Sequence, residues 1–479
     1  MISVIFGETI VLQQENGPDV HLQVRGDEFY AVHKTLDGYT VVYDIDLGLY
    51  CYANVLDGRL VSTRTPITKS PPLEIPRHLR ESESVRKAKF EHRFAQLRPR
   101  DTVTDSNIHR VFGPADGLLT GRRLSEGHVL GLTVLVEFQD VDATVEADDI
   151  HNMLNSANFT LNGNVSSVRE YFRLVSNGRF DYENRVVGPI KLSQNKRFYE
   201  TTLFVEEALN LVSNSLGVNL ADFDSRGEGI IDAINFMYAG RTVYGIGGDN
   251  NNPSELWPHS STINLTFGSV RTNFYQLSSM GRQRVDLSIG TFCHESGHLL
   301  CRFPDMYDYG NRDGDSVDSR GIGSYCLMGS GNHLNEGRTP APVCAYLRDL
   351  VGWTTNRIFL LGSGIHTVRH SDYGTVVKYE TDRLNEYFLV ENRTSKGLDA
   401  HLPSSGLAVY HCDRLGSNEL QQGTSTRHYQ CALLQADGRH DLENNQPADT
   451  SDLFGKTRGW HCLTRQCLHR ESGAARIPA

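Results

Sequence analysis

The sequence predicts an α+β fold, with β-rich segments at both ends of the chain and a mixed region of helices and strands between them. Three observations favour this class. Short strand-like runs, separated by turns that contain Gly and Asp, fill residues 1–70. Helical and buried-strand patterns alternate from Val129 to Trp353, and short strand-like runs return after Trp353.

The composition is that of an ordinary soluble globular protein. Of 479 residues, 39% are hydrophobic and 22% are charged, which is enough apolar material for a sizeable core. The formal net charge of −11 argues against a nucleic acid or an anionic membrane surface as partner, because both attract basic faces. No apolar run is long enough to cross a bilayer, and the sequence gives no indication of an oligomeric state.

The N-terminal region divides into a small β unit and a charged linker. Residues 1–70 are predicted to form strands near 21–24, 29–33, 39–43 and 49–53. The first residues are apolar but lack a basic segment and are interrupted by Gly7 and Glu8, so they make a poor secretion signal. Residues 71–125 carry several prolines and a dense run of charge, which is typical of an exposed connector.

The middle of the chain carries the longest periodic patterns. An almost continuous apolar run at 129–138 predicts a buried strand, and 230–238 predicts another. Apolar residues at helical spacing predict helices over 167–175, 204–216, 287–303 and 341–351. Beyond Trp353, four runs predict strands at 375–379, 387–390, 407–411 and 429–434.

The predicted helix at 287–303 contains His294-Glu295-x-x-His298. This spacing places two imidazoles one turn apart with a carboxylate beside them. The apolar residues of the helix fall on the opposite side, so we expect the histidines to face a cleft. A helix that carries two histidines by chance is the alternative, and the rest of the chain has to decide between them.

Two helical histidines can hold zinc if a third protein ligand completes the site and one position stays open for water. Bound zinc would lower the pKa of that water and polarise a substrate carbonyl, while Glu295 would take the proton and pass it to the leaving amine. Asp305 and Asp308 are the nearest candidates for the third ligand. We favour Asp305, because Pro304 breaks the helix and turns the chain back at that point.

A methionine among glycines follows the helix, in Cys326-Leu327-Met328-Gly329-Ser330-Gly331. A methionine in a tight turn beneath the histidines is the pattern of metzincins. We therefore expect Met328 to form the floor of the site.

Together these segments resemble the immune inhibitor A-type metallopeptidases, a secreted bacterial family of zinc proteases. The likeness rests on His294 to His298, on Pro304-Asp305-Met306-Tyr307-Asp308, on the Met328 turn and on Val351-Gly352-Trp353, and extends over about residues 20–455. Two departures stand out. One extra residue separates His298 from Asp305, and Cys301 replaces a customary glycine, either as a buried thiol or disulfide partner or as a residue that approaches the metal.

The resemblance also implies structural calcium. The loop Asp222-Phe-Asp224-Ser-Arg226-Gly-Glu228-Gly-Ile-Ile-Asp232 resembles an oxygen-rich calcium loop, with Asp224, Glu228 and Asp232 as candidate ligands. Arg226 stands where a carboxylate is expected, so a salt bridge could replace the ion. A solvated acidic turn is the other interpretation.

The resemblance implies a zincin- or metzincin-like catalytic domain over 126–354, preceded by a pro-segment-like unit (1–70) and linker (71–125) and followed by a β-rich module (355–455). Residues 456–479 do not resemble the family. The implied function is secreted zinc endopeptidase activity on proteins or peptides, with His294, His298 and Asp305 on zinc and Glu295 as general base. The rival hypotheses are a catalytically silent binding protein with a protease fold and a calcium-stabilised adhesive protein.

Overall fold

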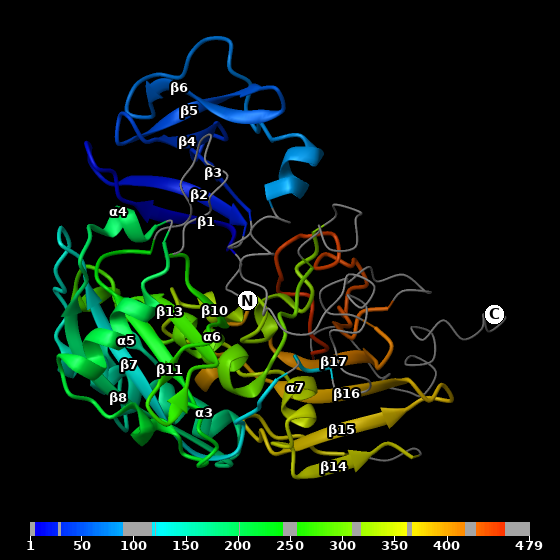
Figure 1. Ribbon diagram of the computed structural model, residues 1–479. Coiled ribbons are helices and arrows are strands. Elements are labelled where there is room, and N and C mark those ends of the chain that lie inside the picture. The colour runs from blue at the N-terminus through cyan, green and yellow to red at the C-terminus, as the bar shows by residue number, and fades with distance from the viewer. Residues whose placement is uncertain are drawn as a thin grey trace. The chain divides into compact units, whose positions relative to one another are not determined.

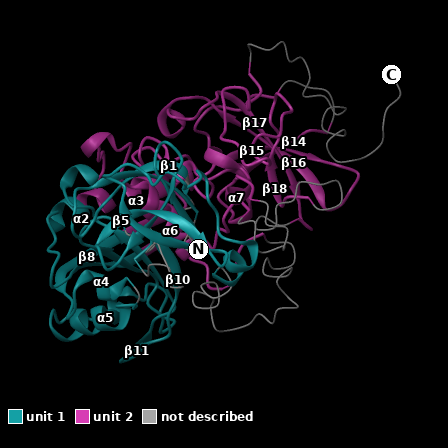
Figure 2. Cartoon of the chain, turned by 90° about the horizontal axis from the view of Figure 1, so that it is seen from above, with its two compact units in different colours: residues 1–100, 130–151, 184–287 teal, residues 101–129, 152–183, 288–479 magenta. Residues whose placement is uncertain are grey.

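The structure is a computed structural model with helices and several separate β-sheets, which confirms the α+β class (Figure 1). It describes residues 5–26, 30–89, 117–119, 121–200, 202–242, 256–308, 318–361, 366–416 and 428–455. The chain divides into two compact units (Figure 2). One comprises residues 1–100, 130–151 and 184–287, and the other comprises 101–129, 152–183 and 288–479.

The N-terminal residues form a six-stranded antiparallel sheet in which the strands follow one another in chain order. The strands are β1 (Ile5–Leu12), β2 (Val20–Gly26), β3 (Ala31–Lys34), β4 (Thr40–Asp44), β5 (Leu49–Leu56) and β6 (Arg59–Pro66). The four predicted strands correspond to β2 to β5. Strands β1 and β6 were not predicted. The apolar start of the chain, which was assigned no structure, forms β1.

A buried tryptophan from later in the chain belongs to the core of this sheet. Trp257 is 1% exposed and packs with buried residues of β1, β2 and β5, including Leu22 and Val24. An ion pair of 3.0 Å between Glu15 and Arg197 joins the same two parts of the chain. The N-terminal sheet therefore shares a core and an ion pair with residues 184–287 of its own unit.

A second sheet has five strands in the order β10-β13-β9-β7-β8. Its strands are β7 (Gly127–Glu137), β8 (Phe180–Lys191), β9 (Ile234–Tyr238), β10 (His259–Thr262) and β13 (Phe274–Ser279). The predicted apolar strand is β7, which pairs in parallel with β9. Helix α5 (Val205–Asn214) packs its apolar residues onto this sheet, in one cluster with Leu132, Val134 and Val136.

Further α-helices and a short ribbon lie between the strands of the second sheet or between that sheet and the C-terminal strands in the chain. The helices are α2 (Ala147–Asn155), α3 (Val168–Val175), α4 (Lys196–Tyr199), α6 (Gly290–Cys301) and α7 (Ala345–Leu350), and the ribbon is β11 (Thr266–Phe267) with β12 (Val270–Arg271). Helix α3 begins as its sequence predicts, because the Ser167 side chain accepts a hydrogen bond from the amide of Glu170. Within the described ranges, no helix has both the length and the apolar composition needed to cross a membrane.

The C-terminal sheet contains β14 (Asn356–Phe359), β15 (Thr375–Glu380), β16 (Glu386–Arg393), β17 (Gly406–Asp413) and β18 (Cys431–Leu433), in that order. Only β14 and β15 pair in parallel, and the other neighbours are antiparallel. The four predicted strands correspond to β15 to β18. The predicted atypical tail at 456–479 and about half of the predicted linker lie outside the described residues, and the predicted domain boundaries stay predictions.

Candidate metal centre

Helix α6 carries both histidines of the His294-Glu295-x-x-His298 pattern and begins at a position that only glycine fits. A Cβ on Gly290 would lie 2.0 Å from the carbonyl oxygen of Asn332, and the amide of Gly290 donates to Gly337 at 2.8 Å. The sequence predicted that the histidines face a cleft, but both side chains are fully buried in the structure. Every residue from Phe292 to Cys301 is buried, because the histidine side packs against other segments of its own unit.

Helix α6 ends at Cys301, and Arg302 caps it. Cys301 stays helical, and Arg302 takes the left-handed conformation with φ of 58° and donates its amide to Gly297. A left-handed conformation costs a non-glycine residue about 1–2 kcal/mol. The guanidinium of Arg302 turns back to the carbonyl of His298 at 3.0 Å, a contact that helps to offset this cost. The helix therefore continues through Cys301 and ends at the left-handed Arg302, three residues before Asp305.

Three side-chain atoms converge at the centre of the site. The Nε2 atoms of His294 and His298 lie 3.1 Å apart, and each lies 3.3 Å from Oδ1 of Asp305. Ligand atoms about 2.0–2.1 Å from a tetrahedral zinc ion stand roughly 3.3 Å from one another. The triangle of His294, His298 and Asp305 therefore has the size that zinc requires, and all three side chains are fully buried.

The orientation of both histidines is fixed by main-chain carbonyls. His294 places Nδ1 2.8 Å from the carbonyl oxygen of Leu327, and His298 places Nδ1 2.6 Å from that of Phe303. A carbonyl can only accept, so each Nδ1 carries the proton and donates it. Each Nε2 then keeps its lone pair for a metal. Metal-bound histidines in proteins commonly donate their other ring N–H to a carbonyl in this way.

The turn around Met328 supports the site from three directions. Leu327 anchors His294, and the carbonyl of Met328 accepts the amide of Met306 at 2.8 Å, next to Asp305. The sulfur of Met328 would lie only 2.8 Å from a Cβ placed on Gly297, so it packs directly against the helix between the histidines. Met328 therefore packs against the helix at Gly297, and its role as the floor of the site stays a prediction.

The contact between Gly297 and Met328 gives a first prediction. We expect Gly297→Ala to destabilise the protein by about 1–3 kcal/mol, because the new methyl group must displace Met328 from a packed core. Urea denaturation followed by circular dichroism measures the loss. Gly178→Ala shows the cost of backbone strain without overpacking, since its φ is 77° and nothing lies within 4 Å of the added Cβ; Gly297 is helical, so its loss must come from packing. Equal or greater stability of Gly297→Ala would contradict the packing described here.

Electrostatics within the triangle favour the metal-binding protonation states of His298 and Asp305, whereas the pKa of His294 is raised, so a metal would have to displace a proton from His294. Burial lowers the pKa of His298 to about 4, and the Asp305 carboxylate offsets only part of this effect. Burial also acts to lower the pKa of His294, but its hydrogen bond to Asp305 and the charges of Glu295 and Asp305 raise it overall. Burial acts to raise the pKa of Asp305, yet the two histidines hold it well below its ordinary value. An ionised carboxylate and neutral imidazole are the forms that bind metals.

The other candidate residues near the helix lie outside the triangle. Glu295 is fully buried but is not a member of the three-residue group, as a general base beside a metal requires. Asp308 pairs its backbone with Ser319 and is not in the group either. Cys301 is a buried thiol without a disulfide, and burial raises its pKa well above the usual range. Among the described residues, no cysteine joins this group.

The candidate calcium loop is organised by its own backbone. Asp224 accepts hydrogen bonds from the amides of Glu228 and Gly229, at 3.0 and 2.7 Å, and Asp232 accepts one from Ser225 at 2.7 Å. Over the described ranges, Asp224, Glu228 and Asp232 are not among the sets whose ligand atoms lie within 4.8 Å of one another. Calcium in this loop stays a prediction.

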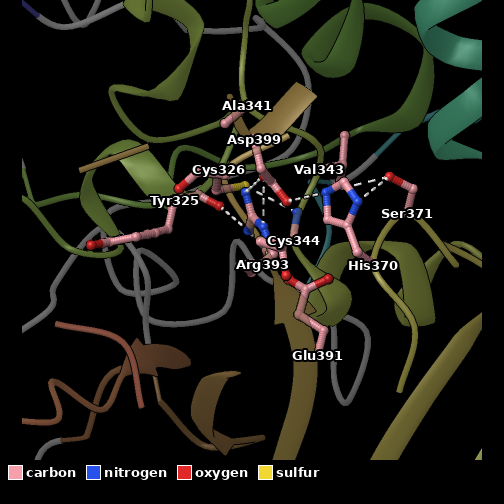
Figure 3. Close-up of polar contacts among 12 residues, drawn as sticks. Tyr325, Cys326, Ala341, Val343, Cys344, His370, Ser371, Glu391, Arg393 and Asp399 are labelled. Carbon is pink, nitrogen blue, oxygen red and sulfur yellow. Dashed lines mark hydrogen bonds and ion pairs between the residues drawn. The ribbon is translucent and has the colours of Figure 1, made fainter. Parts of the chain in front are cut away.

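Arg393, Glu391 and Asp399 form a buried charge network that contacts Tyr325 (Figure 3). The guanidinium of Arg393 donates to the Tyr325 carbonyl at 2.5 Å and to Asp399 at 2.7 and 3.0 Å. It also contacts Glu391 at 3.3 Å, and Glu391 accepts a hydrogen bond of 2.7 Å from Arg348. Tyr325 immediately precedes the turn of Cys326 to Gly331, so this network holds the start of that turn. No sequence pattern singled out Arg393 for this role.

The hydroxyl group of Tyr325 contacts Asp452, and this contact leads to a prediction about the pH dependence of stability. Its hydroxyl donates to Asp452 at 3.1 Å, and burial, assisted by the charges of Asp449 and Asp437, raises the pKa of Asp452 to about 6. Between its ordinary 3.8 and about 6, the folded protein keeps a proton that the unfolded chain has released. Stability from this group therefore falls as pH rises through that window.

Asp452→Asn removes this titration and keeps the shape of the side chain. The free energy of unfolding of Asp452→Asn, minus that of the parent, should increase by about 1–3 kcal/mol from roughly pH 4 to roughly pH 7. Urea denaturation at the two pH values measures the difference. A difference that stays constant or decreases with pH would show that Asp452 titrates normally.

Comparison with known proteins adds no relative. The chain matches no protein-family model, and no curated protein matches its sequence.

Proposed function

We propose that the protein is a zinc-dependent endopeptidase that hydrolyses peptide bonds of protein substrates. The observation that carries the proposal is the buried triangle of His294, His298 and Asp305, whose sides measure 3.1–3.3 Å. The carbonyl contacts of both Nδ1 atoms support it further, because they leave both Nε2 atoms available for a metal.

Within this proposal each residue has one role. His294, His298 and Asp305 hold the zinc ion, which when bound acidifies a water molecule and polarises the substrate carbonyl. Glu295, which is buried beside the triangle, would act as the general base towards the attacking water and then as the general acid towards the leaving amine. Met328 supports the helix beneath the histidines. In the same proposal the protein is secreted, the N-terminal unit is a pro-segment removed before activity, and the loop of Asp224, Glu228 and Asp232 holds calcium.

The test of the metal centre is Asp305→Asn, with Asp308→Asn as its matched control. Loss of the ligating carboxylate should weaken zinc binding at this site at least about 100-fold and abolish casein cleavage, because even second-shell changes cost 10- to 100-fold. Asp308→Asn should keep zinc and activity. Zinc is measured by mass spectrometry after competition with a chelator, on the intact chain and on the chain after limited proteolysis of its N-terminal region.

Two outcomes would count against the proposal. If Asp305→Asn retains zinc and activity while Asp308→Asn loses them, the third ligand is misassigned. If the parent chain binds no zinc through His294 and His298, the silent binding protein becomes the better hypothesis.

A further inference from the structure

The C-terminal sheet brings a second set of metal-ligand types together, far from the His294 helix in the sequence. Glu386, His411 and His428 each offer an atom within 4.8 Å of the others. Nε2 of His411 lies 3.1 Å from Oε2 of Glu386, and Nδ1 of His428 lies 3.9 Å from Oε1 of Glu386. Glu386 and His411 are buried, and the His428 side chain is 12% exposed.

Strand register explains why these residues meet. Glu386 begins β16 and stands directly opposite Asp413 on β17, while His411 stands opposite Phe388. Residues two apart on a strand share a face, so Glu386, His411 and Asp413 all lie on the same face of the sheet. His428 precedes β18 and sets its ring against that of His411, with centroids 5.2 Å apart.

Two buried carboxylates, Glu386 and Asp413, make this face of the sheet favourable for a cation. Two carboxylates directly opposite each other on neighbouring strands repel, and here both Glu386 and Asp413 are buried. Arg383 offsets part of this charge with a 2.7 Å hydrogen bond to Oε1 of Glu386. Asp413 accepts a hydrogen bond from Asn385 at 2.6 Å and lies 2.7 Å from Nδ1 of His428.

We propose that Glu386, His411 and His428 form a second divalent-metal site, with zinc as the preferred ion. Two imidazoles and one carboxylate are a ligand set that zinc accepts, and a solvent molecule can take the fourth position. In this site Nδ1 of His428 donates to Asp413, which acts as the outer carboxylate that orients the ring, and Nε2 of His428 is the atom that would bind the ion. The ion would tie β16 and β17 to the segment that leads into β18. This site is made of other residues than the proposed catalytic centre and does not depend on it.

Zinc counting on the full chain tests the proposal. The parent chain, stripped with a chelator and reloaded with Zn²⁺ against a weak competitor, should bind about two ions per chain. His411→Asn with His428→Asn should lose one of them, and His294→Asn with His298→Asn should lose the other. His440→Asn is the matched control, because its exposed ring lies 3.7 Å from Glu443 in the same unit and should cost no zinc.

A second measurement covers variants that fold poorly. In the His294→Asn/His298→Asn chain, which lacks the first site, added Zn²⁺ should raise Tm, and Co²⁺ should give the absorption bands of a four-coordinate nitrogen and oxygen site. No zinc bound by this chain, or no loss on changing His411 and His428, would overturn the second site. If instead His294 and His298 hold no zinc while His411 and His428 do, the proposed function fails and the second site stands.

Discussion

Glu295→Gln should abolish peptide-bond hydrolysis while the protein keeps its zinc. The substitution preserves the size of the side chain and removes only its ability to accept and return a proton. A positioned general base contributes about 10²- to 10⁴-fold, so we expect kcat for a casein-derived peptide to fall by at least about 100-fold. The metal should remain because Glu295 is not a member of the His294, His298 and Asp305 group.

Glu336→Gln is the matched control for this variant. Glu336 is a glutamate outside α6. Its side chain is 79% exposed and pairs with Arg338. It should leave kcat, KM and zinc content unchanged. Cleavage by Glu295→Gln at the parental rate would refute the proposed role, and loss of zinc by Glu295→Gln would indicate that Glu295 supports the metal instead.

The largest loss of stability should follow from Arg393→Leu. This guanidinium is fully buried and contacts Asp399, Glu391 and the Tyr325 carbonyl. Removing one partner from a buried ion network leaves uncompensated charge and costs about 3–5 kcal/mol. Arg393→Lys should recover little of this, because an ammonium cannot reproduce the several directed donors of a guanidinium.

Arg439→Leu serves as the comparison, since Arg439 also contacts several carboxylates but is half exposed. Its partners are Asp437, Asp441 and Asp449, which the structure also groups as a candidate metal cluster. Arg439 already neutralises that cluster, and exposed ion pairs contribute about 0–1 kcal/mol. Urea denaturation should therefore separate the two variants clearly. Equal losses would mean that the buried network is no more important than the exposed one.

Arg393→Leu should also weaken zinc binding, because the network holds the start of the turn that contains Leu327 and Met328. Zinc affinity, measured at a urea concentration where the variant is still folded, distinguishes this effect from unfolding. An unchanged affinity would limit Arg393 to a structural role.

The sequence was most informative where a pattern is local. The strand at 129–138, the helix at 167–175 and four C-terminal strands follow from periodicity, and the structure contains all of them. Pro304 pointed to Asp305 because a proline ends a helix and turns the chain. The distances of 3.3 Å from Asp305 to both histidines agree with that expectation.

Features that depend on distant contacts were not accessible from the sequence. The histidine side of α6 is buried by segments that follow later in the chain. Helical periodicity alone could not show this and predicted that the histidines face a cleft. The cluster of Glu386, His411 and His428 depends on strand register, and its residues are separated in sequence by amounts that match no known metal spacing. The left-handed Arg302 was equally hidden, since that conformation normally marks a glycine.

Both histidines of the triangle are oriented by main-chain carbonyls, those of Leu327 and Phe303, and not by side chains. A carbonyl is present whatever residue occupies its position, so side-chain replacement at 327 or 303 leaves these acceptors in place. An insertion or deletion in the same segments moves the acceptor itself. We therefore expect evolution to tolerate substitutions at positions 303 and 327. Changes in the length of these segments should be tolerated only where a helix end can absorb the added residue.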